Sequence, residues 1–315
     1  MKRIFHKLSI LLGLTISLVA LFFAMQSIDW TQTLQTICKL NVFYVLVALF
    51  FLISGIFLRA ERWHIITAKR FVRLPFYKGT VLGLFFNYIY PARAGDVIKV
   101  VHLHRSTGLS LKRLGLSAIV DRIMDVLMLI FLAWLSLMFI PNLDVGGRFL
   151  YIAAACLILG VFLGLSPIGE KFLHIMDRRL ICESGEQQWK HGLKKVVHGL
   201  LLFRKEITHK SRLLALSSLF LIMALLDYCS IYFLFNAFSW QLPFITPVVV
   251  WVFISLGTAL PSAPAGIGIH QLACIMSLKI FTVSQSDAFA FSLIFQAVSF
   301  ASVLMTMLLV MSRRS

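Results

Sequence analysis

Residues 87–96 have the sequence Asn87-Tyr-Ile-Tyr-Pro-Ala-Arg-Ala-Gly-Asp96 and interrupt an apolar run that begins near residue 80. Proline and glycine disfavour helix, because proline lacks the backbone N–H and glycine loses the most conformational freedom on ordering. A second apolar run, residues 244–281, contains a similar interruption with the sequence Pro261-Ser-Ala-Pro-Ala-Gly-Ile-Gly268. The placement of these two breaks decides how the chain folds.

The composition around the breaks is that of a polytopic membrane protein. Of the 315 residues, 59% are hydrophobic and only 14% are charged, against ~25% charged in an ordinary soluble domain. A helix needs about 20 apolar residues to cross the hydrocarbon core of a bilayer. The runs of roughly that length are residues 8–25, 42–58, 114–140, 149–165, 213–236 and 288–311. We therefore predict an all-α integral membrane protein with six full spans, in a single domain over residues 1–315.

The basic residues orient these spans. The chain has 30 Lys and Arg against 13 Asp and Glu, a net charge of +17. In a chain this apolar, that excess favours anionic lipid headgroups over nucleic acid. Nearly all of the basic residues fall in cytoplasmic loops when the N-terminus is placed inside, as the positive-inside rule requires. Residues 8–25 are too long for a signal-peptide core of ~7–15 residues. We interpret them as an uncleaved anchor, with both chain termini in the cytoplasm and the protein in the cytoplasmic (inner) membrane.

The same rule predicts the shape of the two broken regions. Basic loops flank residues 80–98 on both sides, so a single crossing would place one of these loops outside. We therefore expect residues 80–98 to form a re-entrant hairpin from the cytoplasmic face, and residues 244–281 to form one from the opposite face. Paired interrupted helices of opposite direction are typical of inverted repeats in transporters, where they mark the substrate site. The alternative is that proline and glycine only kink two ordinary helices.

A basic cytoplasmic segment, about residues 166–212, contains a further pattern. Within it, apolar residues recur at helical spacing over residues 189–207, with Lys, Arg and His on the other faces. This pattern predicts an amphipathic helix on the inner leaflet, or equally a loop helix that packs on the protein itself.

Charged residues inside spans are candidates for function, because each costs about 2.5–3.5 kcal/mol to insert. Asp121 and Asp125 share a helix face, and Arg122 reaches Asp125 at i+3 spacing. These three residues fit a substrate site or, equally, a structural ion pair. Asp227 has no partner nearby in the sequence, which favours a functional role.

The breaks themselves offer anion-binding chemistry. Arg93 is suited to a phosphate, because a guanidinium binds it in a bidentate manner, and Gly95 would free backbone amides beside it. Residues 265–268 would start a half-helix whose N–H groups and dipole also favour an anion. For Asp96 we favour a role as N-cap of the helix that follows, with a headgroup contact as the alternative.

Signatures of catalysis are absent from the sequence. It contains no GxSxG, Walker, HExxH or GxGxxG motif, and its five cysteines have no zinc-site spacing. We therefore predict neither a metal nor a cofactor, and a transporter rather than an enzyme.

Four short elements occur in order along nearly the whole chain. They are Arg59-x-x-Arg62-Trp63, the segment 87–96 with Asn87, Pro91 and Gly95, Asp121-Arg122-x-x-Asp125, and Leu260-Pro-Ser-Ala-Pro264-Ala-Gly266-Ile-Gly268. Together they resemble the lysylphosphatidylglycerol synthase transmembrane, or flippase-like, family. The resemblance implies a membrane region that moves aminoacylated phosphatidylglycerol between leaflets, while a separate soluble domain attaches the amino acid. Related regions are fused to polyprenyl-phosphate sugar transferases. The resemblance adds these substrate-binding candidates: Arg59, Arg62, Asn87, Pro264, Gly266, Gly268 and Gln271.

The sequence departs from the family pattern at three positions. Asp96 replaces the usual Glu of the first break, Ala265 replaces a Gly of the second, and Gln271 stands at a usually acidic position. Loss of the acid disfavours a cationic lysyl headgroup and favours a plain anionic lipid. No synthase domain follows Ser315, so we expect no lysyltransferase activity.

We therefore predict transbilayer movement of an anionic phospholipid or polyprenyl-phosphate-type lipid. Two alternatives remain at this point: a membrane-embedded lipid-linked glycosyl or aminoacyl transferase, and an accessory subunit of a lipid- or glycan-synthesising enzyme.

Overall fold

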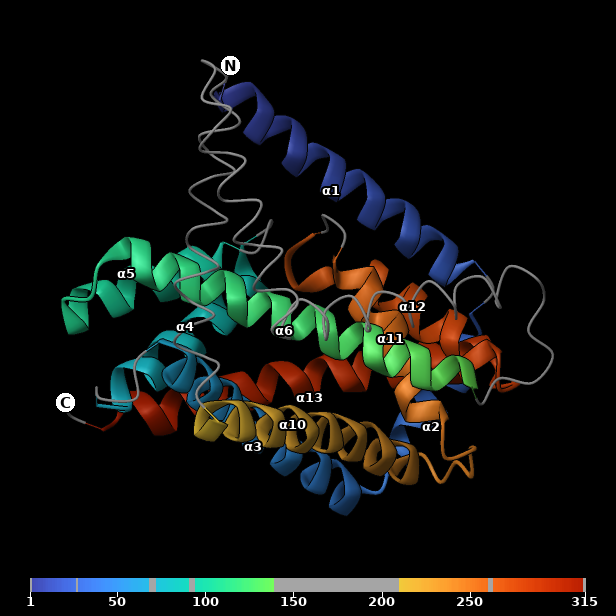
Figure 1. The fold of residues 1–315 in the computed structure, drawn as a ribbon. Coiled ribbons are helices and arrows are strands. Elements are labelled where there is room, and N and C mark those ends of the chain that lie inside the picture. Colours follow the sequence, from blue (N-terminus) through green and yellow to red (C-terminus); the bar gives the residue numbers. More distant parts are fainter. Residues whose placement is uncertain are drawn as a thin grey trace. The chain divides into compact units, whose positions relative to one another are not determined.

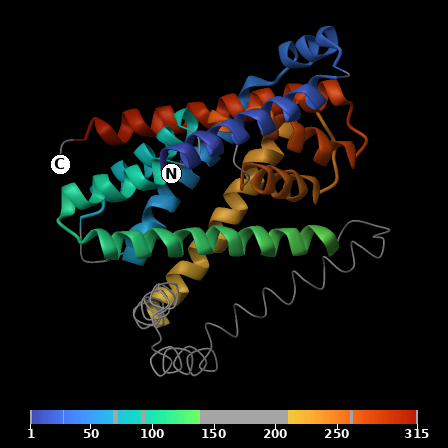
Figure 2. The ribbon, with the colours of Figure 1, turned by 90° about the horizontal axis from the view of Figure 1, so that it is seen from above.

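The computed structural model describes residues 2–26, 28–67, 72–90, 94–138, 210–259 and 263–313. Within these ranges the regular structure is helical and there is no strand, as Figures 1 and 2 show. The helices are α1 (Lys2–Met25), α2 (Trp30–Cys38), α3 (Val42–Thr67), α4 (Leu74–Ile89), α5 (Gly95–Thr107), α6 (Leu111–Met138), α10 (Lys210–Ala237), α11 (Thr246–Ala259), the 3-10 turn η2 (Pro264–Gly266), α12 (Ile269–Lys279) and α13 (Gln285–Met311). The all-α prediction is confirmed for the described part of the chain.

The chain forms two compact units, one of residues 1–118 with 221–315 and one of residues 119–220. The first unit contains both helix breaks and the helices around them. The described part of the second consists of residues 119–138, which are most of α6, and residues 210–220 at the start of α10. The single domain over residues 1–315 stays a prediction.

Three described segments are long and apolar enough to cross a membrane: Val42–Thr67, Leu214–Ala237 and Gln285–Met311. They correspond to the predicted spans 42–58, 213–236 and 288–311, and they show a multi-pass membrane protein. The predicted spans 8–25 and 114–140 fall on α1 and α6, which are not among these three segments. The predicted span 149–165 and the amphipathic segment 189–207 lie outside the described residues. The expectation of six spans is therefore not confirmed.

Helix α3 is longer than predicted. The apolar run suggests an end at residue 58, but the helix continues through Arg59, Arg62 and Trp63 to Thr67. Burial explains the difference, because Arg62 and Trp63 are almost completely covered. The basic segment between residues 58 and 80, which the sequence predicts to be a cytoplasmic loop, therefore begins as helix.

Polar residues fix several helix ends. The Asp29 carboxylate accepts hydrogen bonds from Thr31 N–H and Gln32 N–H at the start of α2. Ser284 Oγ accepts from Asp287 N–H at the start of α13. These side chains satisfy N–H groups that lack an intrahelical partner.

The largest core cluster joins the C-terminal helices. It contains Ile231, Leu234 and Phe235 of α10, Val250 of α11, Cys274, Ile275 and Leu278 of α12, and Phe289, Phe291 and Phe295 of α13. Helix α13 also contacts α2, α3 and α4, so it connects the helices of both breaks (Figure 1).

Candidate functional site

The first break separates α4, which ends at Ile89, from α5, which begins at Gly95, and these two helices pack against each other. A methyl group on Gly95 would overlap the carbonyl oxygen of Gly83, so only glycine allows this close approach. Asn87 Oδ1 accepts a hydrogen bond of 2.9 Å from Gly95 N–H. The break is at the predicted place, and Asn87 and Gly95 hold its two sides together.

The expectation that Asp96 caps α5 is wrong. The N-cap position is Ala94, which has no side-chain oxygen, and Asp96 lies inside the first turn. Asn87 reaches the start of α5 from the preceding helix instead, because the hairpin brings α4 and α5 together. Asp96 remains near the positive end of the α5 dipole, a favourable place for a carboxylate. Arg93 lies outside the described residues.

The second break is built from left-handed backbone. Ala265, Gly266 and Gly268 have φ angles of 58°, 70° and 88°. Glycine adopts such angles freely, whereas Ala265 does so at a steric cost. The break separates α11, which ends at Ala259, from α12, which begins at Ile269, as the sequence predicts.

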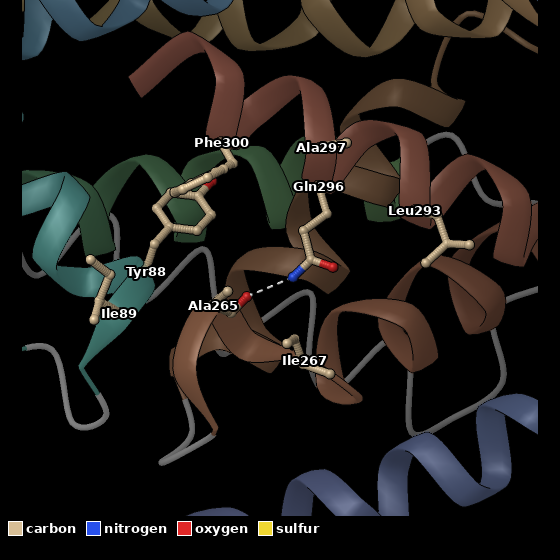
Figure 3. A pocket seen from close by; sticks show the side chains of 8 residues that line it. All are labelled: Tyr88, Ile89, Ala265, Ile267, Leu293, Gln296, Ala297 and Phe300. Atoms are coloured by element: carbon tan, nitrogen blue, oxygen red, sulfur yellow. Dashed lines mark hydrogen bonds between the residues drawn. The ribbon is translucent and has the colours of Figure 1, made fainter. Parts of the chain in front are cut away.

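Two glutamines hold the second break in place, and we call them the glutamine relay. Gln271 Oε1 accepts from Gly268 N–H at 2.7 Å, and Gln271 Nε2 donates to Gln296 Oε1 at 2.7 Å. Gln296 Nε2 in turn donates to the carbonyl oxygen of Ala265 at 2.9 Å (Figure 3). Gln271 is only 2% exposed. The structure thus places Gln271 in the framework of the break, bonded to other parts of the chain.

Helix α1 packs on the same break. Ser17 Oγ accepts a hydrogen bond of 2.7 Å from Ala263 N–H. A methyl group on Gly268 would overlap the carbonyl oxygen of Ser17, so α1 lies directly against the backbone of the break. Of the second-break candidates, Pro264 and Gly266 form η2, which packs against α4.

The two breaks adjoin one cavity of about 370 Å³ (Figure 3). Its described lining comes from the end of α4, from the second break and from the middle of α13. The lining residues are Tyr88, Ile89, Ala265, Ile267, Leu293, Gln296, Ala297 and Phe300. Residues far apart in the sequence therefore meet around this cavity.

An ion pair lies between α3 and α10. Arg59 Nη2 is 3.2 Å from Asp227 Oδ2, with the side chains 32% and 13% exposed. The prediction that Asp227 has no local partner holds for its neighbours in sequence, but the fold supplies Arg59 from another helix. The charge of Arg59 also acts on the hydroxyl of Tyr88, which lines the cavity.

Arg62 and Trp63 lie at the base of the first hairpin. Arg62 is 2% exposed, and Trp63 is fully buried against Phe76 of α4. Trp63 Nε1 donates to Ser117 Oγ at 3.1 Å, and the Lys99 ammonium lies 4.7 Å from the centre of a Trp63 ring. These contacts join α3 to α4, α5 and α6.

His102 lies on the other helix of the same hairpin, near Gly79. Burial lowers the pKa of His102 below its usual value, and the charge of Lys78 lowers it further. Both effects disfavour the protonated imidazole where α5 packs on α4.

Arg122 and Asp125 pair with each other on α6, in the second unit. Arg122 Nη1 is 3.1 Å from Asp125 Oδ2, which confirms the contact predicted from their i+3 spacing. Asp121, in the same turn, is 6% exposed. The structural ion pair that the sequence offered as one interpretation is present.

Sequence reasoning missed Ser17, Tyr88, Gln296 and Phe300. Gln296 had a detectable signal, because it is a lone amide in the apolar run 288–311. Ser17, Tyr88 and Phe300 had none, because their roles depend on which helices meet. Among the described residues, no group of three or more His, Cys, Asp or Glu side chains could hold a metal ion.

Comparison with known proteins gives one family. The family described as lysylphosphatidylglycerol synthase TM region matches residues 10–306. A UPF0104 membrane protein of Methanocaldococcus jannaschii is 26% identical over 229 residues, which cover 70% of this chain and 91% of the relative. A UPF0104 membrane protein of Pyrococcus horikoshii is 24% identical over 306 residues, which cover 90% of this chain and 89% of the relative. No solved structure matches.

Proposed function

Because the chain belongs to the lysylphosphatidylglycerol synthase transmembrane family, we propose that it moves an anionic phospholipid or polyprenyl-phosphate-type lipid between the leaflets of the cytoplasmic membrane. The observation that carries this proposal is a cavity of about 370 Å³ to which both helix breaks contribute. Paired interrupted helices of transporters surround the substrate in this way. A lipid whose phosphate crosses the bilayer needs such an interruption, because the hydrocarbon core offers a phosphate no partner.

In this mechanism Arg93 holds the phosphate during the crossing. Its guanidinium matches two phosphate oxygens at once and stays charged at every physiological pH. Arg59 supplies a second positive charge near Tyr88 on the cavity wall, and Asp227 balances it while no lipid is bound. The partial exposure of Arg59 leaves its side chain accessible for this exchange of partners.

The other candidate residues support the two breaks. Asn87 and Gly95 hold the first break closed, and the relay of Gln271 holds the second. We assign Asp96 a headgroup contact at the start of α5. Arg62, Pro264, Gly266 and Gly268 shape the surrounding backbone. Arg122 and Asp125 stay candidates for a lipid contact on α6.

The proposal includes re-entry of both broken regions from opposite faces of the membrane. It therefore expects both flanks of the first break on the cytoplasmic side. Single cysteines placed at Lys78 and Arg105 should both resist an impermeant thiol reagent added outside intact cells. Labelling of either one from outside would contradict re-entry.

Lipid movement is tested with the purified chain in liposomes that contain fluorescent phosphatidylglycerol. Arg93→Ala should abolish transfer. Arg93→Lys should retain it only in part, because an ammonium keeps the charge but cannot donate two parallel hydrogen bonds to a phosphate. Loss of a charge-assisted contact of ~1.5–3 kcal/mol predicts roughly ten- to hundredfold weaker phosphate binding. Arg105→Ala is the matched control, since Arg105 is exposed at the end of α5.

Two outcomes would overturn the proposal. A transfer rate for Arg93→Ala within twofold of the parent, per folded protein, would remove Arg93 from the site. Chemical modification of the headgroup in the same liposomes, without transfer, would favour a transferase.

A further inference from the structure

The described lining of the cavity between the two breaks is apolar and neutral. None of the described residues that line it carries a formal charge, and six of the eight are aliphatic or phenyl side chains. The two exceptions are Tyr88 and Gln296. A phosphate placed among these groups would lose its hydration, and no described lining residue supplies a compensating charge.

The polar atoms of the lining are already engaged. Gln296 donates to the Ala265 carbonyl and accepts from Gln271, so both ends of its amide are bonded. The Tyr88 hydroxyl bonds to the side chain of Ser299. Figure 3 shows the Gln296 amide directed at the second break. The described lining therefore offers a headgroup few open hydrogen-bonding sites.

The depth of the cavity agrees with its chemistry. Leu293, Ala297 and Phe300 lie near the middle of α13, a membrane-span candidate over Gln285–Met311. At 1.5 Å per residue, Ala297 is about 20 Å from either end of the helix. At that depth a resting lipid presents hydrocarbon, because its headgroup stays at the interface.

The size of the cavity also suits the hydrocarbon chain of a lipid. Its volume of about 370 Å³ is more than twice that of an apolar cavity of about 150 Å³ that holds a benzene molecule. One wall is aromatic, with the rings of Tyr88 and Phe300 5.2 Å apart. A flexible segment of several methylene groups fits these dimensions.

We propose that the cavity between the two breaks binds the hydrocarbon chain of a membrane lipid, with the phosphate held outside it. The inference rests on the proposed function only in its choice of a lipid as the occupant. It divides the site into two parts, an apolar one at mid-depth formed by α4, α13 and the second break, and a charged one elsewhere. Recognition then depends on the lipid chain as well as on the headgroup.

Photocrosslinking tests this division in the full-length chain. The protein is placed in phosphatidylglycerol nanodiscs that contain traces of phosphatidylglycerol carrying a diazirine either at the end of one acyl chain or on the headgroup. After irradiation, mass spectrometry locates the label. The chain probe should label residues 263–267 and 293–300 at least fivefold more than the headgroup probe does.

A variant whose cavity is filled by a larger side chain provides the comparison that tests the inference. Ala297 lines the cavity with its side chain exposed, so Ala297→Phe places a ring in the space. It should lower labelling of the lining by the chain probe at least fivefold. Leu308→Phe is the matched control, since Leu308 is on the same helix, 73% exposed and outside the lining. Leu293→Trp is a second filling variant in case Ala297→Phe does not fold.

Equal labelling of the lining by both probes would overturn the inference. So would chain labelling that stays within twofold of the parent in a folded filling variant. The test of the proposed function is independent of this one, because crosslinking to a bound lipid does not require lipid transfer between leaflets. If the protein shows the expected labelling but moves no lipid, the chain-binding cavity is supported and the proposed lipid transfer is refuted. If it transfers lipid without labelling of the lining, the transfer is supported and the chain-binding cavity is refuted.

Discussion

Replacing Gly95 by alanine should open the first hairpin. The added methyl group would overlap the Gly83 carbonyl oxygen, and its next neighbour would be Asn87 Oδ1 at 2.7 Å. Gly83 is part of the α4 backbone and cannot rotate aside as a flexible side chain could. The helices must separate, which also strains the 2.9 Å bond between Gly95 N–H and Asn87.

The magnitude follows from these two effects. Inserting a methyl group into a packed interface costs about 1–3 kcal/mol, and loss of one amide hydrogen bond adds about 1 kcal/mol. We therefore expect Gly95→Ala to lower the free energy of unfolding by about 3 kcal/mol, roughly a hundredfold in the equilibrium constant. SDS titration in mixed micelles, followed by circular dichroism, measures this difference.

Gly115→Ala is the matched control. Gly115 lies within α6, and a methyl group there would meet nothing within 4 Å. The substitution should leave stability unchanged or raise it by about 0.5–1 kcal/mol, because alanine is the better helix former. A Gly95→Ala variant within 0.5 kcal/mol of the parent, an amount of about the size of such surface effects, would refute the close approach of α4 and α5.

Two further predictions concern the contacts around the cavity. Asp227→Asn should lower the free energy of unfolding by about 1–3 kcal/mol, less than the loss of a fully buried pair, because Arg59 is partly exposed. A double-mutant cycle with Arg59→Met, measured by SDS titration, tests this contact. A coupling energy below about 0.5 kcal/mol would show that the ion pair does not stabilise the protein. Gln296→Leu should lower the free energy of unfolding by about 1–3 kcal/mol in the same titration, because the Ala265 carbonyl and the Gln271 amide lose their hydrogen bonds. Met305→Leu, at an exposed position of the same helix, is the control. An effect of Gln296→Leu no larger than that of the control would show that the glutamine relay does not stabilise the break.

The sequence predicts the positions of the breaks well, because local chemistry produces them. Proline and glycine around Pro91 and Pro264 exclude a continuous helix regardless of the surroundings. The i+3 contact of Arg122 with Asp125 is predictable for the same reason, since helical geometry alone brings these residues together.

Contacts between helices far apart in the sequence were not predictable from local pattern. Asp227 and Arg59 are 168 positions apart, and each is only an isolated charge in the sequence. The cap of α5 illustrates the same limit at short range. Asp96 has the residue type of a cap, but it lies inside the first turn of α5. Asn87 makes the bond from eight residues away, because the hairpin brings it there.

The contact of Ser17 with Ala263 has a consequence for biosynthesis. The two residues are 246 positions apart, so α1 leaves the ribosome long before the segment that it must hold. At about 5–20 residues per second, α1 waits on the order of ten seconds or more in the membrane before α11 and α12 arrive. During that time the face of α1 that will cover the second break is open to lipid or to chaperones. Truncated chains that stop before α12 therefore lack a completed second break, and the surface of α1 around Ser17 stays uncovered in them.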